Sequence, residues 1–272
     1  MKIGLIAGGG QFPILFSQKA FEKGYKVFAA GFNSETDPLL SDYVEELKLF
    51  YLGQVTKLIR YFKQQGISQA VMLGTIKKTN IFKDIRPDFK ALTFIAKTTR
   101  THDDSILTSF ADLLLKEGIE ILPSTFLLPE LICTRGCWTK RKPNKAEQKD
   151  IIEGWRLAKE IGKLDIGQCL VIANGTVLAI EAIEGTDAAI KRGGLLSHNN
   201  GCVVIKLSKP SQDLRFDLPS SGCQTIMIMH EAGASILVLE AGKSISFDRE
   251  EMISLADQYH IAILGYTDED IK

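Results

Sequence analysis

Short apolar runs alternate with stretches of helical spacing over roughly the first 125 residues. The apolar runs predict strands at 2–7, 26–30, 69–73 and 119–122. Apolar residues that recur with helical spacing predict helices at 11–23, 55–65 and 103–116. Because strands that alternate with helices form βαβ units, this half is predicted to be a Rossmann-like domain with a mostly parallel sheet.

The second half shows a different pattern. A helix is predicted at 148–163, and the pair Asn174-Gly175 predicts a tight hairpin, since both turn positions require a positive φ angle. Further strands are predicted at 168–173, 176–182, 202–207, 235–239 and 260–264, and further helices at 225–230 and 249–259. A short helix is expected to end at Lys191 and Arg192. These elements predict an α+β domain. Together with the Rossmann-like first half, they make α/β the predicted fold class of the whole chain.

The pattern loses its period between 126 and 147, where Pro129, Gly136 and Pro143 interrupt it. A chain of 272 residues also exceeds the usual size of one domain. We therefore expect a Rossmann-like N-terminal domain at 1–127, a linker at 128–147 and an α+β C-terminal catalytic domain at 148–272.

Composition excludes several classes of protein. Hydrophobic residues make up 45% of the chain, and 33 basic residues balance 33 acidic ones, as in an ordinary globular protein. The isoelectric point of about 6.9 leaves no electrostatic footprint for nucleic acid. No apolar run approaches the ~18 to 20 residues of a membrane-spanning helix, and no signal peptide is evident. We expect a cytoplasmic protein with five reduced cysteines and no zinc site.

Charged side chains are concentrated at 209–219, between Pro210 and Pro219. Such a segment predicts a stiff polar loop, because proline cannot donate a ladder hydrogen bond and buried charges need partners. Asp213 and Asp217 supply the oxygen ligands that Mg²⁺ prefers, and Lys209 and Arg215 supply cations suited to phosphate. The alternative is a surface loop in which Arg-Asp pairs only fix the local shape.

A glycine-rich loop, Gly8-Gly9-Gly10, stands at the junction of the first strand and helix, where an anion can bind. It does not match the dinucleotide fingerprint, because Pro13 occupies the position of the last glycine. The second strand also ends without the acid that binds ribose. NAD is therefore disfavoured, while a nucleotide diphosphate or sugar phosphate remains open, as does a plain tight turn.

Two further groups of polar residues flank predicted elements. Thr75 follows a strand at the edge where α/β sheets bind ligands, and His102, Asp103 and Asp104 open a helix. Helix capping is the simpler role for the two aspartates. In the second half, 181–187 reads Glu-Ala-Ile-Glu-Gly-Thr-Asp, where regular alternation would place Glu181 and Ile183 on one face of a strand.

Together, 4–13, 101–104, 165–168, 181–187 and 209–219 resemble the UDP-2,3-diacylglucosamine pyrophosphatases of the lipid A pathway. This is the class unrelated to the calcineurin-like phosphoesterases. The resemblance runs over almost the whole chain in the right order. One departure is 74–78, Gly-Thr-Ile-Lys-Lys, where the family pattern has Arg-Pro or Lys-Pro after the glycine.

The resemblance implies Mg²⁺-dependent hydrolysis of a pyrophosphate bond to UMP and 2,3-diacylglucosamine 1-phosphate, with the lipid held between two domains. Asp213 and Asp217 are expected to bind the metal and orient water, in an order left open. Arg215 and Lys209 are expected to bind the phosphates. The other expected substrate contacts are Gly8, Gly9, Gly10, Pro13, Thr75, His102, Asp103, Asp104, Glu184, Gly185, Thr186, Asp187 and Gln212.

The expected partners are a lipid-linked sugar nucleotide and, peripherally, the cytoplasmic surface of the inner membrane, with no nucleic acid. A homodimer is the default assembly. Two alternatives stay open. A sugar-nucleotide-binding or regulatory module of the same fold would lack turnover, and a Rossmann oxidoreductase would need the NAD that Pro13 disfavours.

Overall fold

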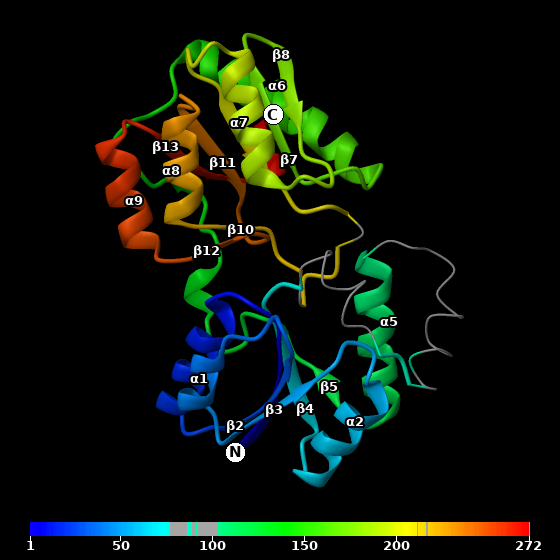
Figure 1. Ribbon diagram of the computed structural model, residues 1–272. Coiled ribbons are helices and arrows are strands. Elements are labelled where there is room, and N and C mark those ends of the chain that lie inside the picture. Colours follow the sequence, from blue (N-terminus) through cyan, green and yellow to red (C-terminus); the bar gives the residue numbers. More distant parts are fainter. Residues whose placement is uncertain (77–85, 89–90, 92–102, 211, 216, 272) are drawn as a thin grey trace. The chain divides into compact units, whose positions relative to one another are not determined.

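The computed structural model describes all residues except 77–85, 89–90, 92–102, 211, 216 and 272 (Figure 1). At 103–105 it describes the backbone alone. The chain forms two compact units. The first comprises Met1–Pro129 together with Asp213–Asp217, and the second comprises Glu130–Gln212 and Leu218–Lys272. The segment Asp213–Asp217, expected in the second domain, thus packs with the first unit.

The first unit contains a five-stranded sheet in the order β3-β2-β1-β4-β5, and every neighbouring pair is parallel. Its strands are β1 (Lys2–Ala7), β2 (Lys26–Phe32), β3 (Glu46–Phe50), β4 (Gln69–Leu73) and β5 (Glu120–Ile121). Strand β3 was not predicted. It lies at the edge of the sheet and carries Glu46 and Lys48, so it lacks the continuous apolar run of a buried parallel strand.

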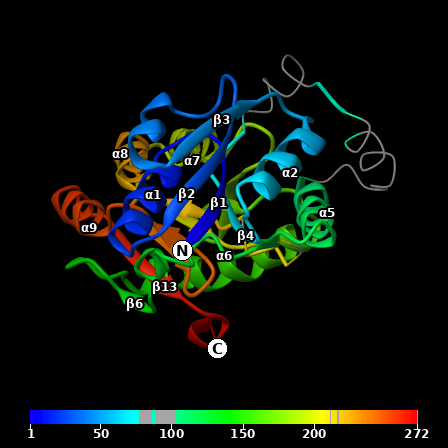
Figure 2. The ribbon, with the colours of Figure 1, turned by 90° about the horizontal axis from the view of Figure 1, so that it is seen from below.

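Helices cover both faces of this sheet, α1 (Phe12–Glu22) on one side and α2 (Val55–Gln64) and α5 (Asp103–Lys116) on the other (Figure 2). Alternate residues of each strand point to opposite faces. Thus Ile6, Phe28 and Ala30 share one core with α2 and α5. The short 3-10 helix η1 (Pro38–Tyr43) follows β2. This arrangement confirms the Rossmann-like domain with a parallel sheet.

The second unit contains a six-stranded mixed sheet in the order β6-β13-β11-β9-β7-β8. Its strands are β6 (Gly136–Cys137), β7 (Cys169–Ala173), β8 (Thr176–Ile180), β9 (Val203–Lys206), β11 (Ile236–Glu240) and β13 (Ala262–Tyr266). Strands β9, β11 and β13 are parallel, and β7 runs antiparallel to β8 and β9. Two short strands, β10 (Ser220–Ser221) and β12 (Ile245–Ser246), pair separately. The carboxyl ends of β9, β11 and β13 therefore form one edge.

Two hydrophobic cores lie on opposite faces of this sheet. One includes residues of α7 (Thr186–Leu196), α8 (Cys223–Glu231) and α9 (Arg249–Gln258), and the other includes residues of α6 (Lys145–Lys163) and the 3-10 helix η3 (Asp268–Ile271). Figures 1 and 2 show α6 on the side of the sheet opposite α7 and α8. Helix α7 packs closely on β7, because a Cβ atom at Gly193 would lie 2.5 Å from the Val171 Cγ1 atom.

Several boundaries differ from the predictions for clear reasons. Helix α6 begins at Lys145 because Asn144 and Glu147 form a capping box, and β6 lies within the segment predicted as a linker. The predicted hairpin is confirmed, with φ angles of 51° at Asn174 and 74° at Gly175. Strand β8 ends at Ile180, and Glu181 is buried while Ile183 is exposed, so the predicted alternation does not extend to Ile183. None of the helices described is long and apolar enough to cross a membrane.

Candidate active site

The glycine-rich loop of the first unit bonds to the segment after β4. The Gly8 N–H donates to the Leu73 carbonyl oxygen at 2.8 Å, and Gly9 and Thr75 exchange two backbone hydrogen bonds. A Cβ atom at Gly8 would lie 2.6 Å from the Thr75 oxygen, so this contact requires glycine. These two N–H groups are therefore used within the fold, as in a plain tight turn. Gly10, with a φ angle of 92°, has open space where a Cβ would stand.

Pro13 lies in the first turn of α1 and is buried. Its carbonyl oxygen accepts a hydrogen bond from the Ser17 hydroxyl at 2.9 Å. Pro13 thus lies within the first unit, three residues after the glycine-rich loop. Its role as a substrate contact stays a prediction.

Lys209 and Gln212 are held by a loop of the second unit. The Lys209 Nζ atom lies 2.8 Å from Asp165 Oδ1, and both side chains are largely shielded from water. The Lys209 N–H donates to Gln212 Oε1 at 3.1 Å, and Gln212 Nε2 donates to Gln168 Oε1 at 3.4 Å. Residues 165–168 thus hold the start of the charged loop in place through these contacts. Asp165 and Gln168 were noted as a motif but not chosen as site residues.

Asp213, Arg215 and Asp217 belong to the first unit. Arg215 donates from Nε and its terminal nitrogen to both oxygens of Asp213, at 3.0 and 2.7 Å, and its backbone N–H also reaches Oδ1. The Asp217 N–H donates to the Asp213 carbonyl oxygen at 3.1 Å. Hydrogen bonds from Arg215 hold the pKa of Asp213 below its usual value, against the opposing effect of burial. The Arg-Asp pair therefore helps to fix the local shape of this loop.

The described residues do not assemble the expected metal site. Among them, no group of three histidine, cysteine, aspartate or glutamate side chains is placed to hold an ion. Asp213 has suitable oxygen atoms, but Arg215 engages both. Mg²⁺ binding by Asp213 and Asp217 stays a prediction that the described arrangement does not support by itself.

The residues Glu184, Gly185, Thr186 and Asp187 lie at the start of α7. Gly185 precedes the helix with a φ angle of 87°, and no side chain caps the helix start. Two hydrogen bonds lower the pKa of Glu184. The larger effect comes from its own backbone N–H, and the smaller comes from the Arg192 guanidinium, 2.9 Å from Glu184 Oε1. Thr186 donates to Glu181 at 3.0 Å, and Asp187 lies in the first turn. The start of α7 therefore presents uncapped N–H groups.

The remaining predicted residues can be placed only in part. His102 lies outside the described residues, as does Lys78. Asp103 begins α5 and Asp104 follows it, but only their backbone is described, so helix capping by either side chain stays a prediction. Their contacts with substrate stay predictions.

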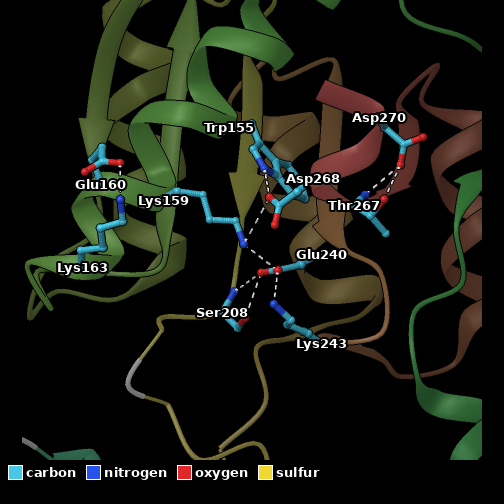
Figure 3. A network of polar contacts seen from close by, with 10 residues as sticks. All are labelled: Trp155, Lys159, Glu160, Lys163, Ser208, Glu240, Lys243, Thr267, Asp268 and Asp270. Atoms are coloured by element: carbon cyan, nitrogen blue, oxygen red, sulfur yellow. Dashed lines mark hydrogen bonds and ion pairs between the residues drawn. The ribbon is translucent and has the colours of Figure 1, made fainter. Parts of the chain in front are cut away.

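A buried charged network at the carboxyl end of β11 was missed (Figure 3). Glu240 is 3% exposed and accepts hydrogen bonds from Lys159 Nζ at 2.6 Å and from Ser208 N and Oγ at 3.0 and 2.9 Å. Lys243 Nζ lies 2.9 Å from Glu240 Oε1. Burial raises the pKa of Glu240, but the two lysines outweigh it and lower the pKa overall. The signal was a lone acid at the end of an apolar strand.

The network continues along α6. Trp155 Nε1 donates to Asp268 Oδ1 at 2.8 Å, and Lys159 Nζ lies 3.7 Å from the same oxygen. Trp155 and Lys159 also line a surface hollow of about 440 Å³. Since Glu240 binds the residue before Lys209, this network anchors the charged loop at its point of departure from the second unit.

The chain is a two-unit α/β protein in which the charged loop follows β9 of the second sheet. Family models for the LpxI N-terminal domain and the LpxI C-terminal domain match residues 2–131 and 134–264. The chain is 33% identical over 275 residues to UDP-2,3-diacylglucosamine pyrophosphatase LpxI of Caulobacter vibrioides, covering 97% of each chain. The chain therefore belongs to the LpxI family, which confirms the resemblance inferred from its motifs.

Solved structures give only distant likenesses. A biotin carboxylase domain of a single-chain bacterial carboxylase is 12% identical, with a TM-score of 0.28, over 58% of this chain and 29% of that one. The protein gox2253 is 11% identical, with a TM-score of 0.29, over 99% of this chain and 86% of that one. The match to the carboxylase thus spans less than a third of its length, and these low scores carry no argument about function.

Proposed function

We propose that the protein hydrolyses the pyrophosphate bond of UDP-2,3-diacylglucosamine, releasing UMP and 2,3-diacylglucosamine 1-phosphate for lipid A biosynthesis. The observation that carries this proposal is the 33% identity over 97% of both chains to the Caulobacter vibrioides pyrophosphatase. Both family models together leave few residues unmatched, so both domains of that enzyme have counterparts here.

Asp213, Asp217, Arg215 and Lys209 are the residues proposed to act on the pyrophosphate. Asp213 is ionised at neutral pH, as an aspartate ordinarily is, and Arg215 lowers its pKa further. An ionised carboxylate suits either a metal ion or an attacking water. Arg215 has the planar donor fork that matches phosphate oxygens. Phosphate and Asp213 therefore compete for the same guanidinium, so that binding of substrate would release the oxygens of Asp213.

Mg²⁺ is proposed as the cofactor. When bound, it would offset the charge of the pyrophosphate and lower the pKa of a water molecule. The support is chemical, because carboxylate oxygens are abundant in the charged loop while the five cysteines have no zinc-binding pattern. The test is UMP release from the purified protein in excess EDTA and after Mg²⁺ is restored. Activity is expected to disappear and return, and full activity in EDTA would contradict the metal proposal.

The charged loop is tested by Asp213→Asn and Asp217→Asn. Each change is expected to lower turnover by at least ~10²-fold, since loss of a metal ligand or a water-orienting group removes several kcal/mol of transition-state stabilisation. Asp42→Asn, at an exposed position of η1 in the same unit, is the matched control and should keep wild-type turnover. Near-normal rates in both loop variants would show that the reaction is carried out elsewhere.

The acyl chains of the substrate bear on the location of the protein. Because it carries two acyl chains, it is held in the bilayer, and we propose that the protein acts at the cytoplasmic face of the inner membrane through peripheral contact. Co-sedimentation with phospholipid vesicles tests this, and protein that stays wholly in the supernatant with substrate-loaded vesicles would contradict it.

Homodimer formation is a separate proposal, tested by the molar mass in solution from light scattering.

A further inference from the structure

Two buried charged residues lie in one row across three strands of the second unit. Cys169 of β7 pairs with Lys206 of β9 in the sheet register, and the Glu181 N–H donates to the Cys169 carbonyl oxygen at 2.8 Å. Cys169 belongs to the core on the side of α7, α8 and α9, so its neighbours in the row face that side too. Lys206 and Glu181 thus flank the Cys169 thiol at the carboxyl edge of β8 and β9.

Both charges are buried without the partners that such groups require. Lys206 is 6% exposed, and its hydrogen bond among the described residues is to the Ser220 carbonyl oxygen at 2.7 Å. Glu181 is 8% exposed, and while Oε1 accepts from Thr186, Oε2 is buried and has no partner. Neither residue forms an ion pair within the described part of the chain. Since burying an unpaired charge costs several kcal/mol, a ligand that pairs with either group would stabilise the protein.

The charges of Glu181 and Lys206 both act on the pKa of the Cys169 thiol, as their places in the row require. Burial is the largest effect and raises the pKa of this thiol to about 12. The negative charge of Glu181 raises the pKa further, while the positive charge of Lys206 lowers it. The two opposite charges therefore act on one buried atom from its two sides.

Two helices also begin beside these residues without side-chain caps. Helix α7 starts at Thr186, whose hydroxyl bonds to Glu181, and α8 starts shortly after Ser220, which binds Lys206. The Ser221 Oγ atom, just before α8, is also buried and unpartnered. Uncapped N–H groups at helix starts attract anions, and phosphate is one such ligand.

We propose that Lys206 and Glu181 form a binding site for a sugar phosphate. Its phosphate would contact the Lys206 ammonium and the uncapped first turns, and a sugar hydroxyl would donate to Glu181 Oε2. This inference rests on the proposed function, because 2,3-diacylglucosamine 1-phosphate, one half of the substrate, has this chemistry. Because Lys206 and Glu181 are only 6% and 8% exposed, binding would require both charged ends to turn toward the sheet edge.

The test compares Lys206→Met and Glu181→Gln, which remove one charge each and nearly keep side-chain volume, with the wild type. The affinity for 2,3-diacylglucosamine 1-phosphate in detergent micelles and for UMP is measured by calorimetry, and kcat and KM by UMP release. We expect each variant to bind the sugar phosphate at least ~10-fold more weakly, since hydrogen bonds to charged groups are worth that much, and to bind UMP as the wild type does. Lys191→Met, an exposed position of α7, is the charge-matched control.

The outcomes separate this inference from the proposed function. A wild type that hydrolyses the substrate, with both variants binding the sugar phosphate normally, overturns the inference alone. A wild type that binds the sugar phosphate through these residues but releases no UMP overturns the proposed function alone. If Lys206→Met fails to fold, the isosteric Glu181→Gln decides, and normal binding by that variant means that a buried water satisfies Oε2 and that the inference is wrong.

Discussion

The second sheet carries two clusters of buried charge at the same edge and on opposite faces, and they differ in how well they are satisfied. Glu240, on the face of α6, has two ammonium groups and two donors of Ser208 around it. Lys206 and Glu181 lie on the face of α7 and α8, and the side chain of each has one hydrogen bond. Lys206 donates to a backbone carbonyl oxygen, and Glu181 accepts from a hydroxyl. A satisfied cluster can hold the fold together, while an unsatisfied one reduces stability until a ligand arrives.

The contrast separates structural from functional charge within a single layer of the protein. Adjacent residues of β9 illustrate it, since Ile205 packs in the core of α6 while Lys206 points to the other face. Burial alone would rank Glu240, Lys206 and Glu181 together, because all three are less than 9% exposed. Only the count of partners distinguishes them, and that count is a property of the folded chain.

The largest loss of stability is expected for Glu240→Gln. Removing one partner of a buried ion pair leaves uncompensated charge, so we expect the free energy of unfolding of the second unit to fall by about 3 kcal/mol. This is the low end of the usual range, because Lys159 and Lys243 are partly exposed to water. Urea unfolding followed by tryptophan fluorescence reports on this unit alone, since both tryptophans, 138 and 155, lie in it.

The difference in unfolding free energy between wild type and Glu240→Gln should depend on pH. The pKa of Glu240 is lowered in the folded protein, so its contribution is complete above the unfolded pKa of ~4.3 and is lost as the pH falls through the folded pKa. The stability gap between wild type and Glu240→Gln is therefore expected to be constant from neutral pH to about 5 and to narrow in more acidic solution. A gap that keeps its full size in the most acidic solution in which the protein stays folded would contradict the assigned role of charge.

A smaller effect is expected for Trp155→Phe. This change removes the indole hydrogen bond to Asp268 and some buried volume, which together should lower the free energy of unfolding by about 1 to 2 kcal/mol. Because Asp268 is largely exposed, water can replace the lost donor. Trp138 remains as the fluorescent reporter in this variant. A loss as large as that of Glu240→Gln would mean that the network acts through Asp268 instead.

The smallest effect is expected for Lys163→Ala, on the same helix. Its ion pair with Glu160 is 2.6 Å long, but both side chains are mostly exposed. Exposed pairs contribute roughly 0 to 1 kcal/mol, so we expect a change below about 0.5 kcal/mol by the same urea measurement. A larger loss of stability would show that a short distance between the charged atoms makes an ion pair strong even where both side chains are exposed.

The sequence predicted the elements with strong local signals and missed those that depend on partners far along the chain. Apolar runs located β1 and β4, and Asn174-Gly175 located the hairpin, because these signals are local. Strand β3 and the assignment of Asp213–Asp217 to the first unit depend on tertiary contacts that no spacing encodes.

The candidate site was predictable to a similar degree. Charge density and proline positions singled out the loop that contains Asp213 and Arg215, and the bidentate contact between them follows from their chemistry. Glu181 lay within a recognised motif but was not selected, and Lys206 and Glu240 each ended an apolar strand. Their burial follows from the sheet edge on which they meet, which the sequence alone does not define.

The most direct test of the contrast is the free energy of unfolding of wild type and Lys206→Met, each measured in detergent without and with saturating 2,3-diacylglucosamine 1-phosphate. Without ligand, the variant is expected to be at least as stable as the wild type, because it lacks an unpaired buried charge. With ligand, the wild type should become the more stable protein, since tighter binding gives greater stabilisation. A variant that is less stable without ligand, and that gains as much from ligand as the wild type does, would contradict the account.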